Sequence, residues 1–204
     1  MKKKLLGVVM MLCVASILGA CSNYKFKPTT SYEIEDFEFT NQNGEAVSLE
    51  SLKGKPWLAM FVFTNCNTVC FPMMNNMAEI QQKLVDKGVE DYNIVAFSVD
   101  PANDTPEVLA EYLKRYSVPD ESKWQLLTGY DQTYIEQFGR KSFNTFIKAV
   151  EGEEQVTHMN TFNLVDETGI VVKTYTGASE AEGGVPIDTI AIDLQTLIEE
   201  RLGK

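Results

Sequence analysis

Apolar and polar positions alternate along this chain in blocks that predict strands and helices in turn. Trp57–Phe63 is continuously apolar, as expected of a central strand buried on both faces, and Asn93–Val99 has the same character. Between these strands, apolar residues recur at helical spacing from Cys70 onward: Met73, Met77, Ile80 and Leu84. The spacing predicts a helix with one buried face, whose methionines belong to the core rather than to a metal site.

The second half of the chain continues this alternation. Thr105 followed by Pro106 predicts a helix start, because threonine caps the first free amides and proline suits the first turn. A strand over Trp124–Leu127 and a helix over Gln132–Ser142 are predicted to follow. The last predicted helix is amphipathic, with apolar residues at these positions: Ile190, Leu194, Leu197 and Ile198.

Two hairpins are predicted at the flanks of this pattern. The first runs from Phe37 to Leu49 around an Asn-Gln-Asn-Gly turn. The second joins Thr161–Val165 to Ile170–Thr176 around Asp-Glu-Thr-Gly. Strand–helix alternation with flanking hairpins predicts one α/β domain, a sandwich around a mixed central sheet with an additional N-terminal hairpin, over residues 32–204.

The N-terminus is predicted to be a secretory signal. Lys2–Lys4 form a basic start, the apolar run Leu5–Leu18 is too short to span a bilayer comfortably, and small residues precede Cys21. A cysteine directly after the small residues resembles the lipobox of bacterial lipoproteins, in which that cysteine is diacylated. We therefore expect a signal peptide over residues 1–20 and lipidation of Cys21, the alternative being ordinary cleavage that leaves a free thiol.

Lipidation would place the domain on the outer face of the cytoplasmic membrane, held by a short polar tether over residues 21–31 that carries Pro28. Three of the 18 basic residues belong to the signal, which leaves 15 against 29 acidic ones and a net charge of −14. Such a balance argues against nucleic acid as a partner, because binding to it depends on neutralising phosphates. It is typical of a solvated surface.

Removal of the signal also removes Cys13, so only Cys66 and Cys70 remain as reactive cysteines. They lie in FTNCNTVCFPMM, residues 63–74, where the first central strand passes into its helix. Ligands bind at this end of the strands in open α/β sheets. At the start of a helix, free amides and the helix dipole favour a thiolate, which we expect on Cys70. The pair could form a structural disulfide, a redox pair or part of a metal site.

His158 is the only histidine, and it lies in QVTHMNTF just before the predicted strand Thr161–Val165. In thioredoxin-like folds the loop that enters this strand faces the cysteine motif and normally carries a cis-proline. Here no proline lies between Pro119 and Pro186, and a histidine stands nearby. We therefore expect two sulfurs and one imidazole to converge.

Two thiolates and one imidazole suit copper, especially Cu(I), and could also hold zinc with an open fourth position. Cu(II) would require a further ligand from water or a nearby oxygen. Asp100, in FSVDPANDTP, is a candidate for that supporting role, although Asp before Pro commonly starts a turn.

Four segments together resemble the Sco (SenC) family of copper-site assembly proteins: FTNCNTVC, FSVDPANDTPEVL, LLTGY and THMNTFNLVDETGIVVKTYTG. The likeness covers nearly the whole chain after the signal. The lipobox and the opening NQNGEAVSLESLKGKPWL are most similar to the Gram-positive lipoprotein type. The resemblance implies a thioredoxin-like fold, with Cys66, Cys70 and His158 as copper ligands. It also implies a role in maturing the binuclear copper centre in subunit II of cytochrome c oxidase.

The sequence departs from the family pattern at two positions. Phe71 separates Cys70 from Pro72, where proline commonly follows the second cysteine directly. Met60 occupies a stretch of the central strand that often carries an acidic residue. Neither departure removes a ligand. We expect them to affect only the pKa of the neighbouring cysteines and the affinity for copper.

A second function fits the same cysteines, which leaves enzymatic activity open. A thiol–disulfide oxidoreductase could keep the oxidase cysteines reduced, with help from a thiol reductant, and would not need His158. A thiol peroxidase is excluded, because its Pro and Thr at seven and three positions before the reactive cysteine are replaced by Ala59 and Phe63, or by Phe63 and Asn67. A purely structural disulfide would close so small a loop that it would stabilise little.

Overall fold

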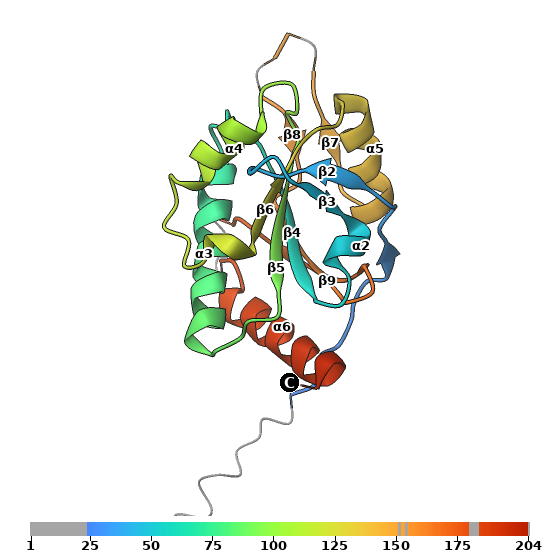
Figure 1. The fold of residues 1–204 in the computed structure, drawn as a ribbon, viewed down its shortest axis with the longest axis vertical. Coiled ribbons are helices and arrows are strands. Elements are labelled where there is room, and N and C mark those ends of the chain that lie inside the picture. The colour runs from blue at the N-terminus through green and yellow to red at the C-terminus, as the bar shows by residue number, and fades with distance from the viewer. Residues whose placement is uncertain (1–23, 151, 154, 180–183, 204) are drawn as a thin grey trace, which may run out of the picture.

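The computed structural model describes residues 24–150, 152–153, 155–179 and 184–203. Its centre is a six-stranded mixed sheet in the order β1-β10-β9-β4-β5-β6 (Figure 1). The strands are β1 (Tyr32–Glu33), β4 (Trp57–Val62), β5 (Asn93–Ser98), β6 (Trp124–Leu127), β9 (Thr161–Val165) and β10 (Ile170–Thr176). β4, β5 and β6 are parallel, whereas β9 is antiparallel to both β4 and β10.

Helices cover this sheet on both sides. The helices are α2 (Leu49–Leu52), α3 (Cys70–Asp86), α4 (Pro106–Leu113), the 3-10 helix η1 (Glu121–Lys123), α5 (Gln132–Phe143) and α6 (Ile187–Leu202). In Figure 1, α3 and α4 lie on one side of the sheet and α5 lies on the other. Two short hairpins stand apart from it: β2 (Glu38–Thr40) with β3 (Ala46–Ser48), and β7 (Ile147–Lys148) with β8 (Thr157–His158).

The core confirms the hydrophobic pattern of the sequence. Every residue of β4 is buried, as predicted for a central strand. On the α3 side, the methionines at positions 73 and 77 are fully buried, which confirms that they belong to the core. On the α5 side, the ring of Phe97 lies 5.4–5.7 Å from four other phenylalanine rings, at positions 37, 61, 138 and 143.

The hydrophobic pattern of the sequence does not predict the shortest elements correctly. Leu49 begins α2 instead of ending a strand, because the Ser48 and Ser51 side chains form a capping box there. Both strands of the β7–β8 hairpin have two residues, too few to show an alternating pattern.

Part of the predicted tether lies against the domain. Phe26 is only 9% exposed. The amides of Thr29 and Thr30 donate to the carbonyl of Val172 at 2.9 and 3.1 Å. The predicted signal peptide and Cys21 lie outside the described residues.

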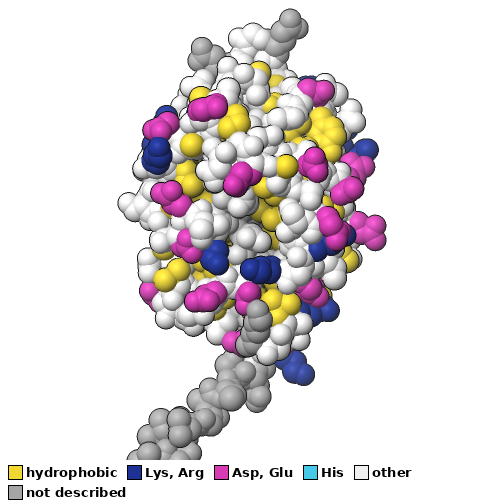
Figure 2. All heavy atoms as spheres, in the orientation of Figure 1, with side chains coloured by type: hydrophobic (Ala, Val, Ile, Leu, Met, Phe, Trp, Pro, Cys, Tyr) yellow, Lys and Arg dark blue, Asp and Glu magenta, His cyan; other side chains and the backbone are white. Residues whose placement is uncertain are grey.

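Acidic side chains are spread over the face shown in Figure 2 and do not gather in one patch. This distribution agrees with the solvated surface expected from the composition. Within the described part of the chain, no helix is long and apolar enough to cross a membrane.

Met77 offers a test of the α3–sheet packing. Because its side chain is fully buried, we expect Met77→Ala to lower the free energy of unfolding by about 2–5 kcal/mol. Met77→Leu conserves the volume and should cost less than about 1.5 kcal/mol. Denaturant unfolding of the two variants measures the difference. Equal losses would contradict a tightly packed core at this position.

Candidate metal centre

The cysteine loop connects the end of β4 to the start of α3. After Val62 the chain turns, and the amide of Cys66 donates to the carbonyl of Phe63 at 3.3 Å. Cys70 is the first residue of α3 and is only 1% exposed, whereas Cys66 is partly exposed. Neither cysteine forms a disulfide in this structure. The strand–helix junction therefore presents two sulfurs of unequal burial.

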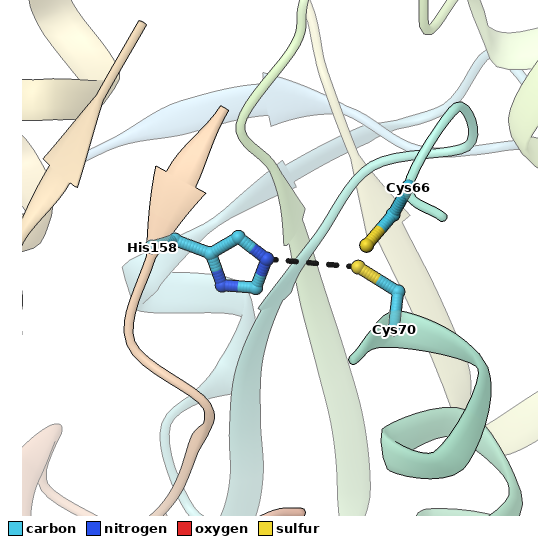
Figure 3. A group of neighbouring side chains, drawn as sticks. All are labelled: Cys66, Cys70 and His158. Carbon is cyan, nitrogen blue, oxygen red and sulfur yellow. Dashed lines mark hydrogen bonds between the residues drawn. The ribbon is translucent and has the colours of Figure 1, made fainter. Parts of the chain in front are cut away.

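His158 reaches this loop from β8. Its Nε2 atom lies 3.6 Å from Sγ of Cys70, and its Nδ1 atom lies 3.1 Å from the carbonyl oxygen of Met159 (Figure 3). A carbonyl only accepts, so Nδ1 carries the proton in this hydrogen bond and the lone pair of Nε2 is directed to the sulfurs. The ring of Phe63 packs edge-on against the imidazole at 5.9 Å. The backbone thus selects the tautomer that a metal site requires.

One ligand atom from each of Cys66, Cys70 and His158 lies within 4.8 Å of the other two. Metal–sulfur and metal–nitrogen bonds of about 2.3 and 2.0 Å at roughly 120° would separate sulfur from nitrogen by about 3.7 Å. The observed 3.6 Å between Cys70 and His158 agrees with that spacing. The three side chains therefore fit a single soft metal ion, and the structure brings together the three residues that the sequence singled out.

The two thiols have very different acidities. A hydrogen bond from the Cys70 thiol lowers the pKa of Cys66 to about 3, with further help from the backbone amides of Thr68 and Cys70. The same hydrogen bond, together with burial, raises the pKa of Cys70 well above its usual value. Cys66 is thus the thiolate at neutral pH, and Cys70 holds its proton until a metal or an oxidant removes it.

The expectation of a thiolate on Cys70 was therefore wrong. The residue before α3 is Val69, which supplies no side-chain cap, so the amide of Cys70, the first of the helix, is available to an outside acceptor. The acceptor is the sulfur of Cys66, which precedes the helix, rather than that of Cys70 within it. Helix position alone could not show which sulfur the amides face.

The structure places Asp104 beside the cysteine loop, a residue that the sequence reasoning missed. Its side chain is fully buried and accepts hydrogen bonds from the hydroxyls of Thr64 and Ser98, both at 2.6 Å. Burial raises the pKa of Asp104, and its charge in turn raises that of Cys70. Asp104 therefore fixes the base of the loop and disfavours a second thiolate.

Asp100, which was considered for a supporting role, hydrogen-bonds within its own turn. Both of its carboxylate oxygens accept from the side-chain amide of Asn103, at 3.0 and 2.9 Å. Its carboxylate is not part of the Cys–Cys–His group. Asp100 instead forms the turn that was the alternative interpretation. Within the same motif, the fully buried carboxylate is that of Asp104, which directly precedes the helix cap at Thr105.

Gln155 is a second residue that the sequence reasoning did not find. Its side-chain amide donates to the carbonyl of Asn65 at 2.9 Å and accepts from the amide of Asn67 at 3.3 Å. Gln155 thereby fastens the segment before β8 to the loop on both sides of Cys66. Only three positions separate it from His158 in the sequence, so the same contact holds the imidazole in place.

The two departures from the family pattern have different surroundings. Met60 is fully buried within β4 and serves the core. Phe71, by contrast, is 64% exposed beside Cys70, and its ring lies 5.8 Å from that of Tyr116. The change at Phe71 therefore alters the surface next to the thiols.

Known proteins support the same assignment. The SCO1/SenC family model matches residues 27–190. An SCO1 protein homolog of Bacillus subtilis is 44% identical over 179 residues, which cover 88% of this chain and 90% of that protein. BsSco, a member of the Sco family of cytochrome c oxidase assembly proteins in which a disulfide switch was identified, is 44% identical with a TM-score of 0.75. That match covers 85% of this chain and 98% of the BsSco chain.

Bradyrhizobium japonicum ScoI, solved with copper bound, is 28% identical with a TM-score of 0.66 and is matched over 81% of this chain and 99% of its own. The mixed sheet and flanking helices agree with these structures, which confirms the predicted thioredoxin-like α/β fold. This chain therefore belongs to the SCO1/SenC family.

Proposed function

We propose that this protein binds copper through Cys66, Cys70 and His158 and delivers it to the binuclear copper centre in subunit II of cytochrome c oxidase. The observation that carries the proposal is the convergence of two sulfurs and one correctly oriented imidazole nitrogen within 4.8 Å. The copper-bound structure of the Bradyrhizobium relative supports the choice of metal. Membership of a family that includes cytochrome c oxidase assembly proteins supports the choice of recipient.

The donor set favours copper over zinc for two reasons. Thiolates are soft ligands that select Cu(I), and at sites with nitrogen and sulfur donors Cu(II) also binds more tightly than zinc. Cu(II) would require a further oxygen ligand, which the described acidic residues do not add to the group. Because Cys70 is protonated before binding, entry of copper releases at least one proton. Release of copper to a recipient is correspondingly assisted when a proton returns to Cys70.

A second function is favoured by the unequal acidities of the thiols. The Cys66 thiolate could attack a disulfide of the oxidase subunit to form a mixed disulfide, and Cys70 could then displace it. The partner would gain two electrons and two reduced cysteines, while this protein would become the Cys66–Cys70 disulfide. A thiol reductant would have to restore the dithiol. The disulfide switch identified in BsSco supports such redox chemistry.

We also propose that acylation of Cys21 anchors the protein to the outer face of the cytoplasmic membrane. The lipobox-like segment before Cys21 supports this location. Each buried CH₂ of an acyl chain adds about 0.8 kcal/mol of membrane affinity, and stable anchoring requires more than one chain. A diacylated cysteine meets that requirement.

We expect the reduced protein to bind one copper ion, with zinc bound less tightly. Removal of any of the three donors, in Cys66→Ala, Cys70→Ala or His158→Ala, should weaken copper binding by at least about 100-fold. Anaerobic competition titration measures the affinity of each variant. Met159→Leu is the matched control, because Met159 adjoins His158 but offers the imidazole only a backbone carbonyl. Wild-type affinity in His158→Ala would show that the site is a dithiol without an imidazole ligand.

The carrier and reductase functions predict different effects of the same variant in cells. If copper delivery is essential, His158→Ala should leave the oxidase deficient even though both thiols remain. We expect a loss of oxidase activity of roughly tenfold or more at limiting copper. The measurement is oxidase activity in cells that express each variant at matched levels, with Met159→Leu as the control. Near-normal oxidase activity with His158→Ala, together with loss of activity in both cysteine variants, would contradict the carrier function and favour the reductase.

Lipid anchoring predicts that loss of Cys21 changes how the protein divides between the membrane and the soluble fraction. Cys21→Ser cannot be acylated, so the protein should leave the membrane fraction or accumulate as an unprocessed precursor. Fractionation followed by mass spectrometry of the N-terminal peptide checks both outcomes. Wild-type protein recovered wholly outside the membrane fraction would refute the anchor.

A further inference from the structure

A buried carboxylate on α6 fastens the first described residues to the domain. Asp193 is fully buried and accepts from Nζ of Lys173 at 2.7 Å and from the hydroxyl of Tyr175 at 2.8 Å. The hydroxyl of Tyr24 donates to the other oxygen of the same carboxylate. A buried charge is stable only while it keeps such partners. The contact with Tyr24 is therefore part of the domain's own ion-pair network.

Phe26 adds a second attachment at the same place. Its side chain is buried, and its ring lies 5.9 Å from Nζ of Lys173, within the range of a cation–π interaction. Further along, the hydroxyl of Thr30 donates to the carbonyl of Val171 at 2.9 Å. Residues 24–30 thus follow β10 and α6 and do not stand away from the domain. We call Tyr24, Phe26 and Asp193 the N-terminal clamp.

The clamp lies at the opposite end of the domain from the metal centre. In Figure 1 the described chain begins beside the C-terminal end of α6, whereas β8 and the start of α3, which carry the centre, lie at the other end of the long axis. β4 has six residues and spans about 20 Å between the two ends.

The position of the clamp limits how far the domain can be from the lipid anchor. Only Ser22 and Asn23 lie between Cys21 and Tyr24. A chain of this length reaches at most about 11 Å. Lys25 and Lys27, which flank Phe26 in this segment, are both exposed. Two cations at this position complement the anionic headgroups of a membrane surface.

We infer that the N-terminal clamp holds the domain in one orientation on the membrane, with the α6 end against the lipid headgroups and the Cys66–Cys70–His158 centre directed away from them. The inference rests on the proposed lipidation of Cys21. It also specifies the recipient: the accepting copper site belongs to a domain that projects from the membrane and approaches the outer end of this protein. A recipient site at the level of the headgroups would not be reached.

Depth-dependent fluorescence quenching tests this orientation. The acylated full chain is placed in vesicles of phosphatidylglycerol and phosphatidylethanolamine that contain a headgroup-spin-labelled lipid. One protein carries a fluorophore on Cys66 in a Cys70→Ser background. Another carries it at the exposed end of α6, through Glu200→Cys with Cys66→Ser and Cys70→Ser. We expect quenching at position 200 to exceed that at position 66 by at least about twofold, since the anchor lies within ~11 Å of the clamp.

Two further variants test the clamp itself and leave Asp193 in place, so that the buried carboxylate keeps its other partners. In Tyr24→Ala/Phe26→Ala the quenching at the two positions should converge. Insertion of about ten Gly and Ser residues between Asn23 and Tyr24 leaves the clamp intact but should reduce quenching at position 200. Thermal unfolding confirms that each variant is folded.

The outcomes separate the orientation from the anchor. Equal quenching at both positions in vesicle-bound wild-type protein would overturn the orientation while leaving the anchor intact. An unchanged difference in Tyr24→Ala/Phe26→Ala would overturn the role of the clamp. Recovery of the purified full chain without acyl groups, outside the vesicle fraction, would refute the anchor and the orientation together.

Discussion

The site depends on the hydrogen bond that the Cys70 thiol donates to the sulfur of Cys66. Val69, the residue before α3, supplies no side-chain cap, and the amides of Thr68 and Cys70 also donate to the sulfur of Cys66. Together these hydrogen bonds give Cys66 its low pKa, and the one from Cys70 contributes most. The burial of Cys70 and the charge of Asp104 then prevent a second thiolate from forming without a cation. A metal ion supplies that cation, which explains why a dithiol of this kind is suited to hold one.

Rigid attachments on two sides keep the three donors together. Asp104 holds Thr64 at the start of the cysteine loop, and Gln155 bonds to the backbone on either side of Cys66. These contacts come from segments that are far apart in the sequence, one after β5 and one before β8. The donors can therefore lie at metal-binding separation before any ion enters, which reduces the ordering cost of binding.

Much of this fold could be predicted from the sequence, because its long elements have strong patterns. The uninterrupted apolar run of β4 and the helical spacing in α3 placed Cys66 and Cys70 at the correct junction. His158 was placed near them only through the strand that follows it, since β8 has two residues and depends on pairing with β7. Which sulfur is the thiolate, and what Asp104 contacts, depend on where the side chains point in three dimensions. Residue types and their spacing do not give that information. For the same reason, Asp100 and Asp104 could not be told apart within one short motif.

The residues at positions 71 and 60 determine the surroundings of the two cysteines. Pro at position 71 would present little side chain, whereas Phe71 places a largely exposed ring next to Cys70 and against Tyr116. Met60 on the neighbouring strand is buried and adds no charge to the centre. Position 60 carries no acid. Among the described acidic side chains, Asp104 is the one whose charge raises the pKa of Cys70. The electrostatics of the centre thus rest first on the hydrogen bond between the two sulfurs and on the burial of Cys70. The charge of Asp104 and the amide at the start of α3 make smaller contributions.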